Sequence, residues 1–135
     1  MKRIYITHCS AKKNLLIEGT TTRVTPSELY SATPIQRFMR KCTERGVEWA
    51  IFSDKYGVWF SRDKHEFYDK DPNTIEIGSD EFNRLVGDFD RKLRSYGEIW
   101  FYHNPGRFHR LYRGLLSTTT LRDKVRLFTH LSEIS

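Results

Sequence analysis

Short apolar runs rich in β-branched and aromatic residues alternate along this chain with longer stretches in which apolar residues recur every three or four positions. The short runs have the length and composition of buried strands. They cover residues 3–9, 47–52, 98–102 and 125–130. The longer stretches have the spacing of amphipathic helices, and they cover residues 34–46, 79–97 and 105–116.

Capping residues mark the boundaries of these helices. Ser79 is a suitable N-cap, and Gly97 ends the apolar stripe that follows it. Pro34 disfavours a helical conformation of the residue before it, so a short turn is expected at Leu29–Tyr30 before the first helix begins. Pro105 is suited to the first turn of the third helix.

The order of these elements predicts the fold class. Strands that alternate with helices imply right-handed parallel crossovers, so we expect an α/β three-layer sandwich with a mostly parallel sheet of about four strands. The 135 residues suit a single α/β domain over residues 1–135. Residues 14–25 and 57–78 show no helical stripe and are predicted to be loops, with a short strand at 58–60 as an option.

Three of the predicted strands run into polar residues with reactive side chains. They continue into the segments Thr7–Lys13, Ser53–Gly57 and His103–Gly106. The carboxyl ends of parallel strands meet at one edge of an α/β sheet, and ligands bind in the crevice there. The sequence therefore predicts one site at that edge.

Charge and cysteine content narrow the class of protein. Lys and Arg total 23 against 17 Asp and Glu, a net charge of +6, which suits an anionic partner such as a nucleotide or nucleic acid. A solvated basic surface is an equal alternative interpretation of this charge. The two cysteines give no disulfide framework and indicate reduced thiols in a cytoplasmic protein. The apolar stretch Ile4–Ile6 is too short for a signal peptide or a membrane-spanning helix, so no membrane contact is expected. Scattered His, Asp and Glu residues lack metal-ligand spacing, and neither a metal nor a cofactor is expected.

Lysines after the strand ends are candidates for binding phosphate. Lys12 and Lys13 follow a small-residue turn, where exposed backbone N–H groups form anion-binding concavities, and Lys55 follows the second strand. The G-x-x-x-x-G-K-[ST] pattern is absent, which disfavours a nucleoside triphosphatase. Solvated surface lysines are the alternative interpretation.

His8, Cys9 and His103 are the candidates for catalysis. Positive charge near Cys9 favours its thiolate form and hence a nucleophile. Adjacent strand residues point to opposite faces, however, so His8 is poorly placed to be the base for Cys9, and packing of Cys9 as a small apolar residue is the stronger interpretation. His8 or His103 would transfer a proton near neutral pH.

Several polar side chains in the same segments are candidates for orienting a substrate. Ser10, Ser53 and Asn104 would hydrogen-bond it, and Tyr56 offers a ring on which a base can stack. A structural tyrosine that caps the core is an equal alternative for Tyr56. Tyr68, in the long middle loop, would close over the crevice.

Arginines recur every third residue around the third predicted helix. Arg107, Arg110 and Arg113, with Lys92 and Arg94 from the preceding segment, would form a basic stripe for a phosphate backbone. Solvated helix arginines are the default interpretation of this pattern.

Motifs in the first half of the chain resemble those of a family of small prokaryotic domains of unknown function. They are Cys9-Ser10-Ala11-Lys12-Lys13, Leu29-Tyr30-Ser31, Ile51-Phe52-Ser53-Asp54-Lys55-Tyr56-Gly57 and Tyr68-Asp69. The family has a small residue where this chain has Asp54. The first motif is also similar, more distantly, to a segment of the uracil-DNA-glycosylase-like domain of archaeosine synthase. These resemblances imply a nucleotide or nucleic-acid setting and a fold that is uracil-DNA-glycosylase-like or flavodoxin-like.

Two hypotheses of function follow. The first is a cytoplasmic enzyme that acts on a nucleotide, nucleoside or nucleic-acid base, at an N-glycosidic bond or in base modification. The second is a non-catalytic RNA- or DNA-binding module whose affinity comes from the arginine stripe. A protein that acts through a protein partner is a third option.

Overall fold

The computed structural model describes residues 2–104 and 108–135, and the statements below concern these residues. A five-stranded sheet has the order β4-β3-β1-β6-β7. Its strands are β1 (Arg3–His8), β3 (Trp49–Ser53), β4 (Gly57–Phe60), β6 (Glu98–Tyr102) and β7 (Val125–Phe128). A small antiparallel ribbon pairs β2 (Arg23–Val24) with β5 (His65–Glu66).

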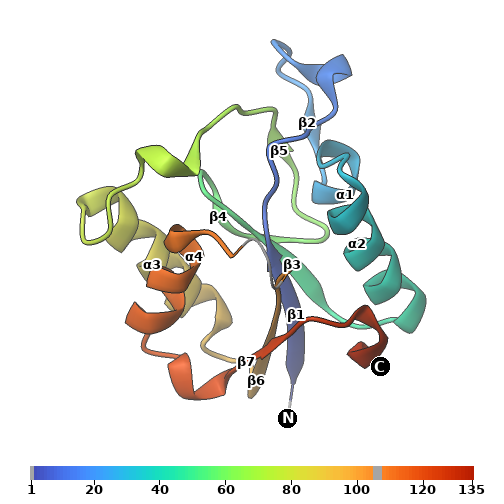
Figure 1. Ribbon diagram of the computed structural model, residues 1–135. Coiled ribbons are helices and arrows are strands. Elements are labelled where there is room, and N and C mark those ends of the chain that lie inside the picture. Colours follow the sequence, from blue (N-terminus) through green and yellow to red (C-terminus); the bar gives the residue numbers. More distant parts are fainter. Residues whose placement is uncertain (1, 105–107) are drawn as a thin grey trace.

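The helices lie on both faces of the sheet. They are α1 (Pro26–Leu29), α2 (Thr33–Arg45), α3 (Asp80–Leu93) and α4 (Arg110–Thr118). Figure 1 shows α1 and α2 on one face and α3 and α4 on the other. The fold is thus mixed α/β, compatible with the predicted three-layer arrangement. None of the helices in the described ranges is long and apolar enough to cross a membrane.

The sheet is mostly parallel. Strand β1 is parallel to β3 and β6, and β6 is parallel to β7. The sequence predicted about four strands, and the fifth is the optional strand at 58–60. It joins as an antiparallel edge, because a tight turn after β3 returns the chain beside it as β4.

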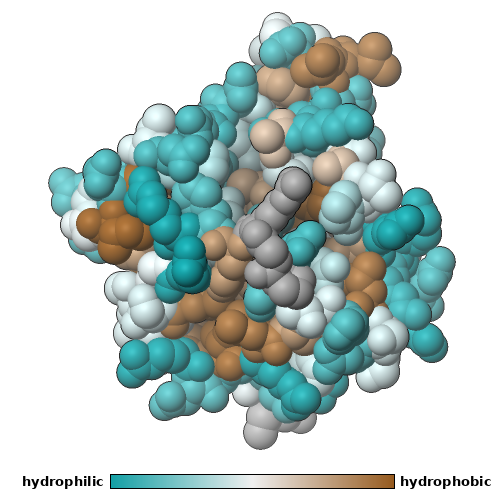
Figure 2. Space-filling view, viewed as in Figure 1, coloured by the Kyte–Doolittle hydropathy of each residue, from teal (hydrophilic) through white to brown (hydrophobic). Residues whose placement is uncertain are grey.

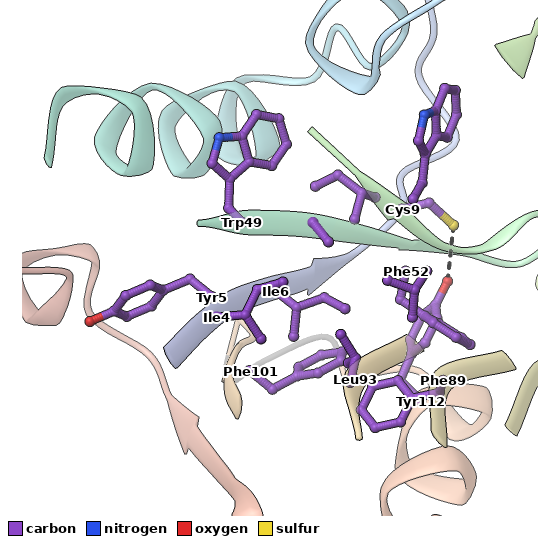
Figure 3. Close-up of a cluster of buried hydrophobic side chains, with 14 of the residues drawn as sticks. Ile4, Tyr5, Ile6, Cys9, Trp49, Phe52, Phe89, Leu93, Phe101 and Tyr112 are labelled. Atoms are coloured by element: carbon purple, nitrogen blue, oxygen red, sulfur yellow. Dashed lines mark hydrogen bonds between the residues drawn. The ribbon is translucent and has the colours of Figure 1, made fainter. Parts of the chain in front are cut away.

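Alternating side chains of the strands build a core on each face. On one face, Phe52 of β3 makes edge contacts with Phe89 of α3 at 5.9 Å and with Tyr112 of α4 at 6.1 Å, measured between ring centroids. On the other face, Phe38 of α2 stacks on Tyr102 of β6 at 5.8 Å. Figure 3 shows Trp49 on the opposite side of the sheet from Phe52, as strand alternation requires.

Helix boundaries follow the predicted caps with three differences. The first is that α3 ends at Leu93, four residues before the predicted stop at Gly97. Ser79 caps α3 as expected, since its hydroxyl accepts the N–H of Phe82 at 3.1 Å. Helix α2 begins at Thr33, and Pro34 lies within its first turn, where a missing N–H costs nothing. Helix α4 begins at Arg110 rather than near residue 105, because His109 caps it by accepting the N–H of Leu111 at its Nδ1, at 3.0 Å. Pro105 lies outside the described residues.

The segments predicted as loops contain more structure than expected. Residues 14–25 hold a turn of 3-10 helix (Leu15–Ile17) and β2, and residues 57–78 hold β4, β5 and a second such turn (Pro72–Thr74). Pairing of β2 with β5 joins the two segments. Two-residue strands give too short a pattern to be recognised in a sequence.

Gly57 is predicted to tolerate no side chain. Its φ is +74°, and an added Cβ would lie 2.1 Å from Oδ2 of Asp88, the oxygen that accepts the N–H of Val58. We expect Gly57→Ala to lower the free energy of unfolding by about 1–3 kcal/mol, measured by urea denaturation. Gly87→Ala is the matched control, because nothing lies within 4 Å of its added Cβ in α3, and it should raise stability by about 0.5–1 kcal/mol. Equal losses in the two variants would contradict the argument.

Candidate functional site at the carboxyl edge of the sheet

The chain leaves the centre of the sheet in two directions. From β1 it crosses one face through α2 to β3, and from β4 it crosses the other face through α3 to β6. Strands β3 and β6 flank β1, so the crossovers diverge at the carboxyl ends of β1 and β6. Ligands of open α/β sheets bind at such a switch point.

A cavity of about 330 Å³ opens at this point. Its lining residues are Thr7, His8, Ser10, Ala32, Pro34, Ile35, Tyr102 and Asn104. The strand ends supply the polar groups, and the start of α2 supplies apolar ones. Thr7 donates a hydrogen bond from its hydroxyl to the carbonyl of Tyr102 at 2.8 Å, which ties the ends of β1 and β6 together.

His8 carries a defined tautomer. Its Nδ1 lies 2.9 Å from the carbonyl oxygen of Cys9, which can only accept, so Nδ1 carries the proton. Its ring stacks on Tyr112 of α4 at 4.6 Å between centroids. Burial lowers the pKa of His8, and the charges of His103 and His109 lower it further, while the Cys9 carbonyl opposes the shift. His8 is therefore a neutral imidazole with an unprotonated Nε2 near neutral pH.

The end of β6 places His103 and Asn104 differently. Asn104 is exposed and lines the cavity. His103 is half-buried beside the cavity, with its ring stacked on Phe108 at 4.5 Å. Its Nδ1 is buried and has no hydrogen-bond partner within the described part of the chain.

A cluster of buried hydroxyls lies behind the end of β3. The hydroxyl oxygens of Tyr30 and Tyr68 are 2.5 Å apart, and Ser53 donates to the Tyr68 hydroxyl at 3.1 Å. The Ser53 oxygen also accepts the N–H groups of Lys55 and Tyr56, at 3.1 and 3.0 Å. Burial raises the pKa of both Tyr30 and Tyr68. Ser53 and Tyr68 are thus committed to holding the turn, and their predicted substrate contacts stay predictions.

Cys9 is buried beside this cluster as a protonated thiol. Its sulfur lies 3.3 Å from the hydroxyl of Tyr112, and Figure 3 shows this contact spanning the end of the sheet. Burial, followed by the negative charge of Asp54, raises the pKa of Cys9 to about 11. Such a thiol is a poor nucleophile at neutral pH. The geometry favours the packing interpretation of Cys9, and its catalytic role stays a prediction.

Asp54 is the most unusual group of the cluster. Its side chain is only 2 % exposed, and its Oδ1 has no hydrogen-bond partner among residues 2–104 and 108–135. Burial raises the pKa of this carboxyl, while the Cys9 thiol, the charge of Lys13 and the Tyr68 hydroxyl partly oppose the shift. An under-bonded buried carboxyl costs stability when it is ionised.

The two consecutive lysines have opposite environments. Lys13 is 8 % exposed, and its ammonium lies 4.6 Å from the centroid of the Tyr68 ring and 3.4 Å from the carbonyl oxygen of Ala11. Lys12 is exposed, as is Lys55. Lys13 therefore belongs to the buried cluster, whereas Lys12 and Lys55 are accessible to an anion.

Tyr56 is half-buried against other rings. His65 stacks on it at 4.1 Å between centroids, and its hydroxyl donates to the carbonyl of Glu66 at 3.0 Å. Ser10 lines the cavity, and its contact with a substrate stays a prediction. Stacking of a base on Tyr56 remains a prediction, and the structure adds His65 as a competing partner for that ring.

The arginine stripe is only partly described. Arg107 lies outside the described residues. Arg110 donates to the carbonyl of Asn73 at 3.0 Å, and it thereby helps hold α4 against the turn at 72–74. Arg113 is exposed.

Sequence reasoning missed several residues of the site. The rule that polar residues after a strand end form the site would have included Asp54, which directly follows β3. Tyr30, just after α1, and Tyr112, in α4, carried no such signal, because neither follows the end of a strand. No group of three or more His, Cys, Asp or Glu in the described ranges is arranged to hold a metal ion.

Comparison of the chain with family models, curated proteins and solved structures found no match. The class of protein is therefore taken from its fold and from the position of its cavity. It is a mixed α/β protein with a cavity at the switch point of a mostly parallel sheet.

Ionisation of Asp54 is predicted to oppose folding. The pKa of Asp54 is raised above its ordinary value of 3.8, so the native state holds this proton more tightly than the unfolded state does. The free energy of unfolding therefore falls as the pH rises from 3.8 through the raised pKa. We expect Asp54→Asn to gain stability relative to the wild type over this window, measured by urea denaturation at a series of pH values. Exposed Asp69→Asn controls for the loss of one negative charge. A pH-independent difference for Asp54→Asn would contradict the prediction.

Proposed function

We propose that this protein is an enzyme that binds one nucleotide unit at the carboxyl edge of its sheet and acts on the base or on the N-glycosidic bond. The observation that carries the proposal is the cavity at the switch point, with His8 in its lining as a neutral base. At about 330 Å³, its volume lies at the lower end of the range for small-ligand sites.

The cavity lining supports a planar, polar-edged ligand. Ala32, Pro34 and Ile35 offer an apolar wall, while Ser10 and Asn104 offer hydrogen-bonding groups. A nucleobase has apolar faces and a hydrogen-bonding rim, so it matches both. Exposed Lys12 and the net charge of +6 favour the attached phosphate.

Hydrolysis of an N-glycosidic bond needs a proton acceptor. In the proposed step a water oxygen bonds to C1′ of the sugar as the C1′–N bond breaks, and Nε2 of His8 takes the water proton. The bonding electron pair leaves with the base, which then takes up a proton from His8. Base modification would use the same acceptor.

The order of the parallel strands supports a finer assignment of the fold. Along the sheet they run β3, β1, β6, β7, which is second, first, third and fourth in the chain. Flavodoxin-like folds share this order, so we infer that the flavodoxin-like alternative applies. The likeness to uracil-DNA glycosylases and the resemblance to the small prokaryotic family stay predictions.

Loss of the His8 imidazole is predicted to remove turnover. We expect His8→Gln to lower the rate of base release or modification by about 10²–10⁴-fold, the usual contribution of a general base. Nucleosides, nucleoside monophosphates and oligonucleotides would be incubated with the protein and the products separated by chromatography. Exposed His130→Gln is the matched control and should keep the wild-type rate. If the wild type binds these ligands but forms no product, the enzyme hypothesis is contradicted and the hypothesis of a non-catalytic binding module remains.

The pH dependence of the reaction is predicted to follow the depressed pKa of His8. A general base must be unprotonated, and the pKa of His8 lies below its ordinary value of 6.5. Activity should therefore persist as pH falls through 6.5 and decline only at lower pH. The rate profile and an NMR titration of the His8 ring should give the same inflection. An inflection at or above 6.5 in both measurements would exclude this assignment of the base.

A further inference from the structure

Helix α2 carries a row of basic side chains that starts next to the cavity. We define the α2 basic ridge as Arg37, Arg40, Lys41 and Arg45. Pro34, one turn before Arg37, lines the cavity. Arg37, Lys41 and Arg45 follow at intervals of four residues, so they project from neighbouring angles of the helix and extend over about 12 Å. The ridge therefore leads away from the cavity along α2.

The charges of the ridge are unpaired. The helix contains one acidic residue, Glu44, against four basic ones. Arg37, Arg40 and Arg45 are exposed, Lys41 is half-buried, and none of the four makes a hydrogen bond or ion pair within the described residues. Only Arg45, in the last turn, has a local role, as a complement to the helix dipole.

On the other face of the sheet, some of the basic side chains have partners. In α3 the basic side chains Arg91 and Lys92 pair with Asp88, at 2.9 and 3.1 Å. In α4, Arg110 donates to the carbonyl of Asn73. Figure 2 shows mainly hydrophilic side chains over α2. Arg84 of α3 and Arg110 and Arg113 of α4 have no acidic partner among the described residues, so the helix with the most unpaired basic side chains is α2.

We propose that the substrate is a nucleotide unit within a single-stranded nucleic acid, whose phosphates lie along the α2 basic ridge while one base enters the cavity. This inference rests on the proposed function. A free nucleotide carries its phosphates at one end and would leave most of the ridge unused, whereas a strand presents a phosphate at every unit. A base must also leave its stack before it can enter a cavity, which a single strand allows at the least cost.

The test compares oligonucleotides with mononucleotides. Fluorescently labelled single-stranded RNA and DNA oligonucleotides would be titrated with wild type, with Arg37→Glu/Lys41→Glu, and with the milder Arg37→Gln/Lys41→Gln. Arg84→Glu/Arg122→Glu makes the same change of charge on exposed residues of α3 and of the turn before β7 and is the matched control. We expect the two ridge variants to raise the oligonucleotide Kd at least tenfold and the control to change it little. The slope of log Kd against log salt concentration should become shallower by about 0.7 for each phosphate that a ridge variant no longer neutralises.

Two results separate this inference from the proposed function. Mononucleotide affinity should be unchanged in the ridge variants, with thermal unfolding as the check on folding. The first result is mononucleotide binding in the cavity together with an oligonucleotide affinity that the ridge variants do not change, or that the control weakens equally. It would overturn the proposed role of the α2 basic ridge and leave the proposed function standing. The second result is oligonucleotide binding that depends on the ridge, with no binding of mononucleotides. It would overturn the proposed nucleotide site in the cavity and leave the α2 basic ridge as a binding surface.

Discussion

Pairing of β1 with strands on both sides is the constraint on which the site depends. Because β3 and β6 both lie parallel to β1, their carboxyl ends reach the same edge. The register sets His8 opposite Phe52 and Thr7 opposite Tyr102, and the hydrogen bond from Thr7 to the Tyr102 carbonyl fixes the two strand ends. A slip of one residue would turn His8 to the other face of the sheet and remove it from Tyr112.

The buried polar cluster adds a second constraint at the same edge. Tyr30 comes from the segment after α1, Ser53 from β3, and Tyr68 from the long middle segment, and their hydroxyls are linked in one network. A buried hydroxyl that lacks a hydrogen-bond partner destabilises the folded state, so each group of the network helps to keep the others in place. The segments that hold Tyr30 and Tyr68 are thereby joined to the end of β3 by side-chain hydroxyls.

The sequence predicted the elements better than their contacts. Periodicity located the helix after Ser79, and short runs of β-branched and aromatic residues located the strand at 98–102 and the predicted strand at 125–130, which ends at residue 128. The convergence of three strand ends was predicted from the rule for parallel sheets. Burial of Lys13 but not of Lys12 was not predictable, since it depends on the pairing of Lys13 with Tyr30. Asp54 was passed over although it directly follows β3, and its burial carried no signal in the sequence.

A single physical effect separates the two candidate catalytic groups on β1 and its extension. Removal from water disfavours whichever form of a group is charged. It is the largest cause that raises the pKa of the Cys9 thiol to about 11, which keeps the sulfur protonated, and the largest cause that lowers the pKa of the His8 imidazole, which keeps that ring neutral. The same burial that makes Cys9 unreactive therefore leaves His8 ready to accept a proton.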